Sequence, residues 1–151
     1  MVWGCMTAHG AGYLGRIDGR LDAELYYKIM EDELMQILEY NEMEKDATIL
    51  QQDNDPKHNS RKAKKCLQEL DMRVLQWPPQ SPDLNPIEHR WDVLKRKLSS
   101  YQNPPQGIHE LWEMIEEKWN EISKEECAAL TASMPRKIHA VLKAKGRNTK
   151  Y

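Results

Sequence analysis

The sequence predicts a single α/β domain, on three observations. The chain has 151 residues, of which 40% are hydrophobic and 30% charged, and this is enough for one domain with a buried core. Short apolar, β-prone runs alternate with stretches whose apolar residues recur at helical spacing. Turn-forming residues separate these segments in the order strand, strand, helix, strand, helix, strand and then three helices.

The first segments form an expected antiparallel hairpin followed by a long helix. Residues 2–6 and 13–17 are two β-prone runs, and the turn-rich residues 8–12 separate them. Asp22 is a suitable N-cap for a helix that reaches about residue 44, because apolar residues recur through it at helical spacing.

Two further strands flank a basic helix. Residues 47–52 form the first of these expected strands, and Asn59 or Ser60 caps a helix over residues 61–70. Residues 72–77 form the next strand, which a pair of prolines ends. The helix is expected to turn four residues toward the core: Ala63, Cys66, Leu67 and Leu70.

Three helices complete the chain. Residues 78–86 hold four of the eight prolines, which predicts a rigid entry into a helix with Asn85 as N-cap and Pro86 in its first turn. This helix is expected to bury a stripe made of Ile87, Trp91, Leu94 and Leu98. Helices over residues 108–122 and 124–144 follow, and Pro135 offers a break in the second.

Charge and cysteine content narrow the class of protein. A net charge of −2 neither supports nor excludes a nucleic-acid partner, since the local distribution of charge decides that question. The three cysteines are odd in number and fit no CxxC spacing, so they are expected to be reduced thiols of an intracellular protein. No apolar run approaches membrane-spanning length and no signal peptide opens the chain, so no membrane partner is expected.

Two acids form the candidate site. Asp53 follows a buried strand at its C-terminal end, and Glu88 lies in the first turn of a helix a few tens of residues later. Carboxylate oxygens are the ligands that Mg²⁺ and Mn²⁺ prefer, and two such ions can clamp the attacking and leaving oxygens of a phosphodiester.

Each acid also has a purely structural interpretation. Asp53 could form an Asx turn that leads into Pro56. Glu88 falls three residues after Asn85, so its side chain could turn back to the Asn85 amide as in a capping box. The residues alone leave both alternatives open.

Basic residues gather near both acids and in the C-terminal tail. Around one site they would form an electropositive rim that binds DNA weakly and without sequence preference; the alternative is an ordinary solvated helix face and a frayed tail. The residues expected to contact nucleic acid are Lys57, His58, Arg61, Lys62, Lys64, Lys65, Arg90, Arg136 and Lys137. For His58 the alternative is a local hydrogen-bonding role within its loop.

Two sequence motifs resemble those of a known protein family. Residues 51–58 read QQDNDPKH and residues 77–88 read WPPQSPDLNPIE, and both resemble the catalytic core of Tc/mariner superfamily transposases, in particular the Tc-like branch. The resemblance extends from residues 1–5 to residues 143–146, so it covers essentially the whole chain.

The resemblance implies a fold, an activity and a cofactor. The fold is expected to be ribonuclease-H-like, of the DDE transposase and integrase type. In this family, water attacks a phosphodiester at a transposon end and the freed 3′-hydroxyl then attacks target DNA. Three carboxylates and two Mg²⁺ or Mn²⁺ ions serve both steps. Asp53 would be the second catalytic and metal-binding carboxylate and Glu88 the third. The expected partners are transposon ends and target DNA, and the expected location is the nucleus.

The chain also departs from the family pattern. The first catalytic aspartate of the family lies on the strand that precedes the one beginning here at Met1, so residues 1–151 are expected to form a truncated domain that lacks this strand and is inactive by itself. The family's N-terminal helix-turn-helix region is expected to be absent as well. The alternative function is a non-catalytic remnant or domesticated module that binds DNA or protein. Self-association, or association with a full-length transposase, is a further expectation.

Overall fold

The computed structural model describes residues 1–79, 81–147 and 149. Gln80 of the second motif and Lys150 of the basic tail therefore lie outside the described residues. The chain divides into two compact units. Unit 1 contains Met1–Trp3 and Gly15–Ser81, and unit 2 contains Gly4–Leu14 and the described residues from Pro82 onward.

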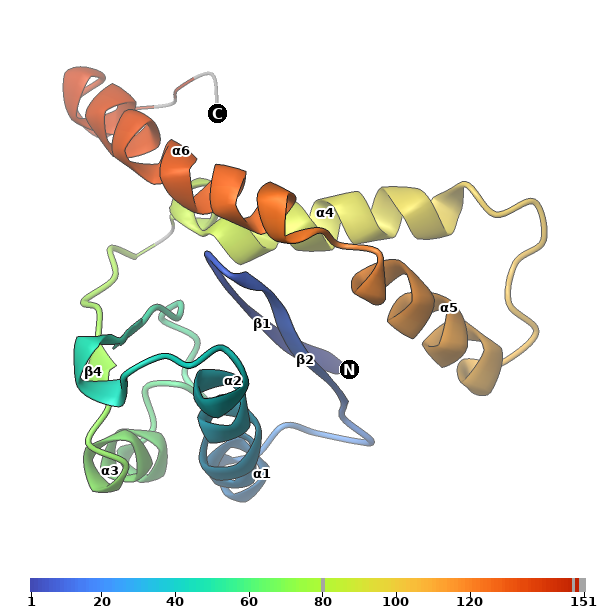
Figure 1. Cartoon of the computed structure of the whole chain (residues 1–151), viewed down its shortest axis with the longest axis horizontal. Coiled ribbons are helices and arrows are strands. Elements are labelled where there is room, and N and C mark those ends of the chain that lie inside the picture. The colour runs from blue at the N-terminus through green and yellow to red at the C-terminus, as the bar shows by residue number, and fades with distance from the viewer. Residues whose placement is uncertain (80, 148, 150–151) are drawn as a thin grey trace. The chain divides into compact units, whose positions relative to one another are not determined.

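The chain opens with the predicted hairpin. Strands β1 (Val2–Thr7) and β2 (Gly10–Arg16) pair as a two-stranded sheet (Figure 1). Both strands are longer than expected and the turn is tighter, because Gly10 adopts a φ of +147° that few other residues tolerate. The tip of the hairpin counts with unit 2 and its base with unit 1.

The predicted long helix of unit 1 begins where expected but is not uniform. Asp22 caps α1 (Ala23–Lys28) by accepting hydrogen bonds from two first-turn amides. A π-helical segment, η1 (Ile29–Leu34), then leads into α2 (Met35–Tyr40). The helix ends at Tyr40 instead of near residue 44, because Asn41 Nδ2 bonds the Ile37 carbonyl and Glu42 takes a positive φ of 51°.

The core of unit 1 lies between this helix and α3 (Arg61–Glu69). Ser60, one of the two predicted caps, accepts a hydrogen bond from the Ala63 amide. The inward stripe of α3 is confirmed, with Leu70 only partly buried. The buried cluster contains Ile17, Leu21, Tyr26, Ile29, Met30, Leu34, Leu38, Ala63, Cys66, Leu67 and Met72.

The two strands on either side of α3 are shorter than the predicted ranges 47–52 and 72–77. β3 (Ile49–Leu50) pairs in parallel with β4 (Arg73–Val74), with Ile49 opposite Arg73. The residues before β3 curl into a short 3-10 turn, η2 (Lys45–Ala47), which removes them from the expected strand. The chain leaves the sheet directly after β3, and Asp53 consequently lies in the loop beyond the strand end.

Unit 2 consists mainly of three helices. After the 3-10 turn η3 (Pro82–Leu84), these are α4 (Pro86–Ser99), α5 (Ile108–Asn120) and α6 (Lys124–Lys143) (Figure 1). Asn85 and Pro86 begin α4 as predicted. The expected break at Pro135 is wrong: α6 runs through it, since Pro135 is exposed and the carbonyl that loses its partner can be hydrated.

Two stacked tryptophans form the centre of unit 2. Trp119 of α5 is 2% exposed, and its ring stacks on Trp91 of α4 with centroids 5.0 Å apart. Its Nε1 donates to the Gly12 carbonyl of the hairpin tip (2.9 Å). Gly4 of β1 faces both rings so closely that a Cβ there would lie 2.9 Å from Trp91. This packing joins the hairpin tip, α4 and α5.

Among the described residues, no helix combines the length and the apolar character that crossing a membrane requires.

Candidate functional site

Asp53 is held through one of its two carboxylate oxygens. Oδ1 accepts a hydrogen bond from the Asp55 amide (3.0 Å) and lies 2.7 Å from His58 Nδ1. Within the described residues Oδ2 accepts no hydrogen bond, and the side chain is 49% exposed. The predicted Asx turn is therefore present, but it uses only one oxygen and leaves the other for a ligand.

His58 lies against Asp53 and Tyr26. A carboxylate can only accept a hydrogen bond, so Nδ1 must carry the proton that it donates to Asp53. The His58 ring also packs on Tyr26 of α1, with centroids 5.2 Å apart and planes at 37°. His58, which the sequence suggested as a DNA contact, is thus bound to the candidate metal ligand in this structure.

The neighbours of Asp53 are also fixed by hydrogen bonds. Tyr26 donates from its hydroxyl to Gln52 Oε1 (2.5 Å), and burial raises the Tyr26 pKa, so the hydroxyl stays a neutral donor. Asn54 Nδ2 donates to the carbonyl of Trp77, the first residue of the second motif (2.8 Å). The backbone N–H of Lys57 bonds Asp55 and lowers the pKa of that carboxyl. Sequence reasoning missed Tyr26 because it lies on a helix far from the motif.

Glu88 lies in the first turn of α4, as predicted. The Asn85 amide donates to the Pro82 carbonyl (2.9 Å), and the Asn85 side chain accepts no cap hydrogen bond from the helix. The capping-box alternative for Glu88 is therefore not the arrangement observed. Glu88 is partly buried.

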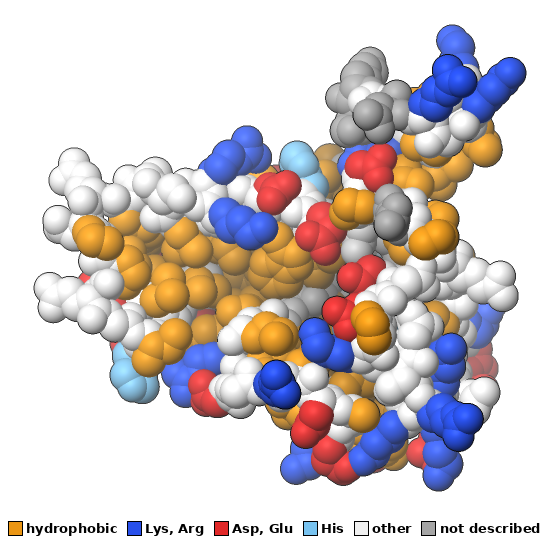
Figure 2. All heavy atoms as spheres, turned by 180° about the vertical axis from the view of Figure 1, so that it is seen from behind, with side chains coloured by type: hydrophobic (Ala, Val, Ile, Leu, Met, Phe, Trp, Pro, Cys, Tyr) orange, Lys and Arg blue, Asp and Glu red, His pale blue; other side chains and the backbone are white. Residues whose placement is uncertain are grey.

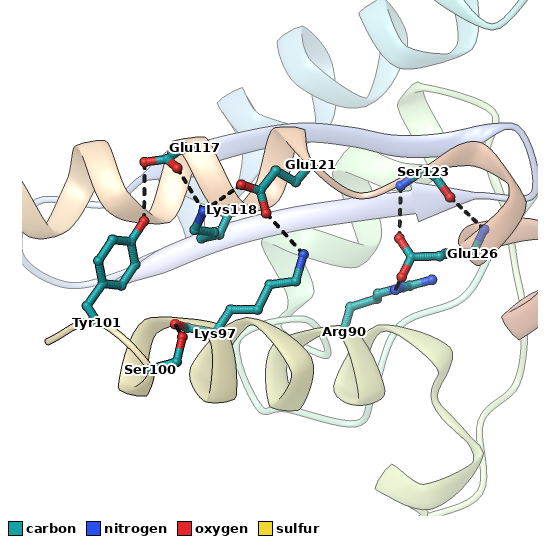
Figure 3. A network of polar contacts seen from close by, with 9 residues as sticks. All are labelled: Arg90, Lys97, Ser100, Tyr101, Glu117, Lys118, Glu121, Ser123 and Glu126. Carbon is teal, nitrogen blue, oxygen red and sulfur yellow. Dashed lines mark hydrogen bonds and ion pairs between the residues drawn. The ribbon is translucent and has the colours of Figure 1, made fainter.

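Arg90 does not lie on an electropositive rim. Its side chain is 4% exposed, and Nη1 pairs with Glu126 Oε1 of α6 at 3.4 Å (Figure 3). Glu126 also forms a capping box with Ser123, whose backbone N–H donates to Oε2. That N–H and, to a smaller extent, Arg90 lower the pKa of Glu126. The prediction that Arg90 contacts DNA conflicts with this burial: the spacing from Leu94 places Arg90 on the inward face of α4.

A second polar network joins α4 to α5. Lys97 donates to Glu121 (3.1 Å), and Lys118 donates to Glu121 (2.5 Å) and Glu117 (2.7 Å) (Figure 3). Tyr101 completes it by donating to Glu117. The network pairs both lysines with carboxylates and links α4, which carries Glu88, to α5.

The remaining basic residues are only partly available to an anion. Lys57, Lys62 and Lys65 pair with Asp55, Glu24 and Glu69. Lys137 donates to the Asp83 carbonyl (3.2 Å). Of the predicted DNA contacts, those that are exposed and form no ion pair with a described residue are Arg61, Lys64 and Arg136. On the face in Figure 2, basic and acidic side chains mostly alternate, and basic ones gather at the end of α6.

The donor chemistry of the two acids fits a divalent ion. Asp53 Oδ2 accepts no hydrogen bond from the part of the chain that the structure describes, and hard carboxylate oxygens suit Mg²⁺ or Mn²⁺. Over residues 1–79, 81–147 and 149, no group of three or more His, Cys, Asp or Glu side chains is arranged to hold a metal ion. Asp53 belongs to unit 1 and Glu88 to unit 2, so their approach to a shared ion stays a prediction.

Known proteins resemble this chain over its whole length. It is 38% identical, over all 151 residues, to the transposable element Tcb1 transposase of Caenorhabditis briggsae and to the Tc1 transposase of Caenorhabditis elegans. The chain spans 54% of the length of each of these relatives.

Solved structures confirm the predicted ribonuclease-H-like α/β fold. The Mos1 transposase catalytic domain with raltegravir and Mn superposes with a TM-score of 0.87 and 18% identity, covering 99% of this chain and 76% of that one. A pre-cleavage Mos1 transpososome gives a TM-score of 0.88 at 15% identity, covering 99% of this chain and 45% of that one. Residues 1–112 match the family described as DDE superfamily endonuclease. The chain belongs to the DDE superfamily endonucleases.

Proposed function

We propose that this chain is part of the catalytic domain of a Tc/mariner-like transposase, which cleaves DNA at transposon ends and joins it to a target. The observation that carries the proposal is the arrangement of Asp53 in a chain of the DDE endonuclease family: Oδ1 accepts two hydrogen bonds, and Oδ2 accepts none from the described residues. Both relatives cited above are transposases of transposable elements, which supports DNA as the substrate.

Asp53 and Glu88 would hold a divalent ion. When bound, Mg²⁺ or Mn²⁺ supplies a Lewis acid that polarises a phosphodiester and helps to activate water. Structures with the same fold were solved with Mn and with Mg, which supports this choice of ion. The chain itself contributes the fixed rotamer of Asp53 and a helix start that presents Glu88.

DNA is the proposed partner, bound through its backbone by the exposed cations Arg61, Lys64 and Arg136. Such binding is sequence-independent and weakens as salt rises, because it releases counterions. A structure with the same fold is the Mos1 transposase paired-end complex with the left transposon end, which supports transposon-end DNA as a partner. Self-association of the chain is a further part of the proposal. Action on chromosomal DNA would place the protein in the nucleus.

A polypeptide limited to residues 1–151 is proposed to be inactive by itself. It supplies two of the three carboxylates that the family motif uses, and two divalent cations a few ångströms apart repel strongly unless enough anionic oxygens bridge them. One ion would bind weakly. We expect no nicking of a transposon-end duplex by this polypeptide with Mn²⁺, and nicking that vanished in Asp53→Asn and Glu88→Gln would contradict this expectation.

Manganese binding tests the shared site directly. The Mn²⁺ affinity of the chain is measured by the loss of the free-ion electron paramagnetic resonance signal, for the parent, Asp53→Asn and Glu88→Gln. Both substitutions should weaken binding at least several-fold. The matched controls are Asp46→Asn and Glu125→Gln, which remove one exposed charge from each unit and should bind as the parent does.

Each outcome separates the candidate functions. Loss of affinity in only one of the two variants would show that Asp53 and Glu88 do not share an ion. Salt-sensitive DNA binding without any Mn²⁺ binding would favour the non-catalytic binding module.

A further inference from the structure

His58 contacts the candidate metal ligand in a way that suggests a role of its own. We propose that His58 is a positioning residue for Asp53: its Nδ1–H holds Oδ1, so that Oδ2 is the oxygen left for a divalent ion. This inference rests on the proposed function, because it requires Asp53 to be a metal ligand. It replaces the expectation that His58 contacts a DNA phosphate.

The geometry around Oδ1 explains how the carboxylate is fixed. An aspartate that is 49% exposed would rotate about χ1 and χ2 and lose that freedom when it binds an ion. Here the Asp55 amide and His58 Nδ1 both donate to the same oxygen, at 3.0 and 2.7 Å. Two donors on one oxygen select one rotamer and distinguish the two oxygens before any ion arrives.

His58 is itself held by the core of unit 1. Tyr26 is 1% exposed, lies in the buried cluster, and packs its ring on His58. The Tyr26 hydroxyl also holds Gln52, the residue before Asp53. Tyr26 of α1 therefore contacts both His58, which bonds Asp53 Oδ1, and Gln52, which precedes Asp53 in the chain.

The same contacts argue against a phosphate-binding role. The His58 side chain is only 20% exposed. Its Nδ1 proton is donated to Asp53, so this donor is not free for a phosphate. Removing a residue that hydrogen-bonds a metal ligand typically weakens metal binding by roughly 10–100-fold. A positioning role for His58 therefore predicts a measurable change in metal affinity.

Two substitutions of His58 separate the effect of its Nδ1–H donor from the effect of its ring. His58→Asn keeps a nitrogen donor at the position of Nδ1 but loses the ring that packs on Tyr26. His58→Phe keeps the ring but loses the donor. A positioning role predicts that the Asn variant retains metal binding and the Phe variant does not, whereas a packing role predicts the reverse.

The measurement is a Mn²⁺ titration of the ¹⁵N-labelled chain, followed by paramagnetic broadening of the backbone amides of residues 52–55. We expect parent and His58→Asn to be broadened at similar Mn²⁺ concentrations and His58→Phe to need about tenfold more or higher. The DNA affinity of His58→Phe without metal should equal that of the parent. His58→Gln, whose amide matches the other ring nitrogen, should behave as His58→Phe and serves as the second variant if the Phe protein does not fold.

The outcomes distinguish this inference from the proposed function. If the parent is broadened near Asp53 and His58→Phe responds at the same concentration, the positioning role is wrong and the metal site stands. Reduced metal-free DNA affinity in His58→Phe would place His58 on DNA and also overturn it. If the parent shows no broadening near Asp53, the metal site fails and the positioning role fails with it.

Discussion

Asp53 and Glu88 are held in place by different physical means. Asp53 follows a strand of two residues, and hydrogen bonds from neighbouring loop residues fix its side chain. Glu88 begins a helix of 14 residues, and tertiary packing fixes that helix through the Trp91–Trp119 stack and the buried Arg90.

Because of this difference, substitutions near the two acids should affect different properties. A typical hydrogen bond contributes about 0.5–1.5 kcal/mol to stability, whereas removing a buried aromatic side chain costs about 3–5 kcal/mol. Changes around Glu88 should therefore lower the free energy of unfolding. Changes around Asp53 should alter the orientation of the carboxylate and leave most of the stability intact.

The largest expected effect comes from Trp119→Ala. This change removes the stacked ring and the hydrogen bond to Gly12, so the free energy of unfolding should fall by about 3–5 kcal/mol in urea denaturation. Trp112→Ala, on the same helix but only partly buried, should cost clearly less. Equal losses would mean that the tryptophan stack does not hold α4.

Gly4→Ala tests the same packing from the hairpin. The added methyl would lie 2.9 Å from Trp91 and 3.1 Å from Trp119, so the rings must shift, and we expect a loss of about 1–3 kcal/mol by thermal and urea unfolding. Gly15→Ala is the matched control, because a Cβ at Gly15 meets no atom within 4 Å. A Gly4→Ala protein as stable as the Gly15→Ala protein would show that this interface is loose.

Glu126→Gln should flatten the dependence of stability on acid pH. Because the folded pKa of Glu126 lies below its usual value of 4.5, its ionised form stabilises the folded state above that pH, and this contribution is lost as pH falls through the folded pKa. The carboxyl is half exposed, so the loss at pH 7 should be only about 1 kcal/mol. The difference in unfolding free energy between parent and variant should shrink from about pH 5 to about pH 3. Glu125→Gln should leave the parent profile unchanged.

Tyr26→Phe should have the smallest effect on stability and tests the Asp53 side. It keeps the buried ring and removes only the hydroxyl that holds Gln52, so about 0.5–1 kcal/mol should be lost. Amide chemical shifts should change at Gln52 and Asp53 but little in α4. A loss as large as that of Trp119→Ala would break the contrast between the two sides.

The sequence by itself determined the features that depend on near neighbours. The helix starts at Asp22 and Ser60 were predictable, because each cap side chain bonds amides two or three residues away. The start at Asn85 was predictable from Pro86, which suits the first helical position. The Asx turn at Asp53 spans two residues and could be foreseen in the same way. The motifs around Asp53 and Glu88 are enough to indicate the family and its fold.

Only the tertiary structure decided how distant segments use those residues. Strands β3 and β4 are only two residues long, because the length of a strand depends on its pairing with a segment elsewhere in the chain. Spacing from Leu94 puts Arg90 on the inward face of α4, but its partner there, Glu126, comes from another helix. His58 bonds Asp53, and the ring of Tyr26, which lies 32 positions earlier in the chain, packs on His58. Local sequence sets backbone conformation and caps, but the environment of a side chain depends on which segments pack around it, and no local pattern encodes that.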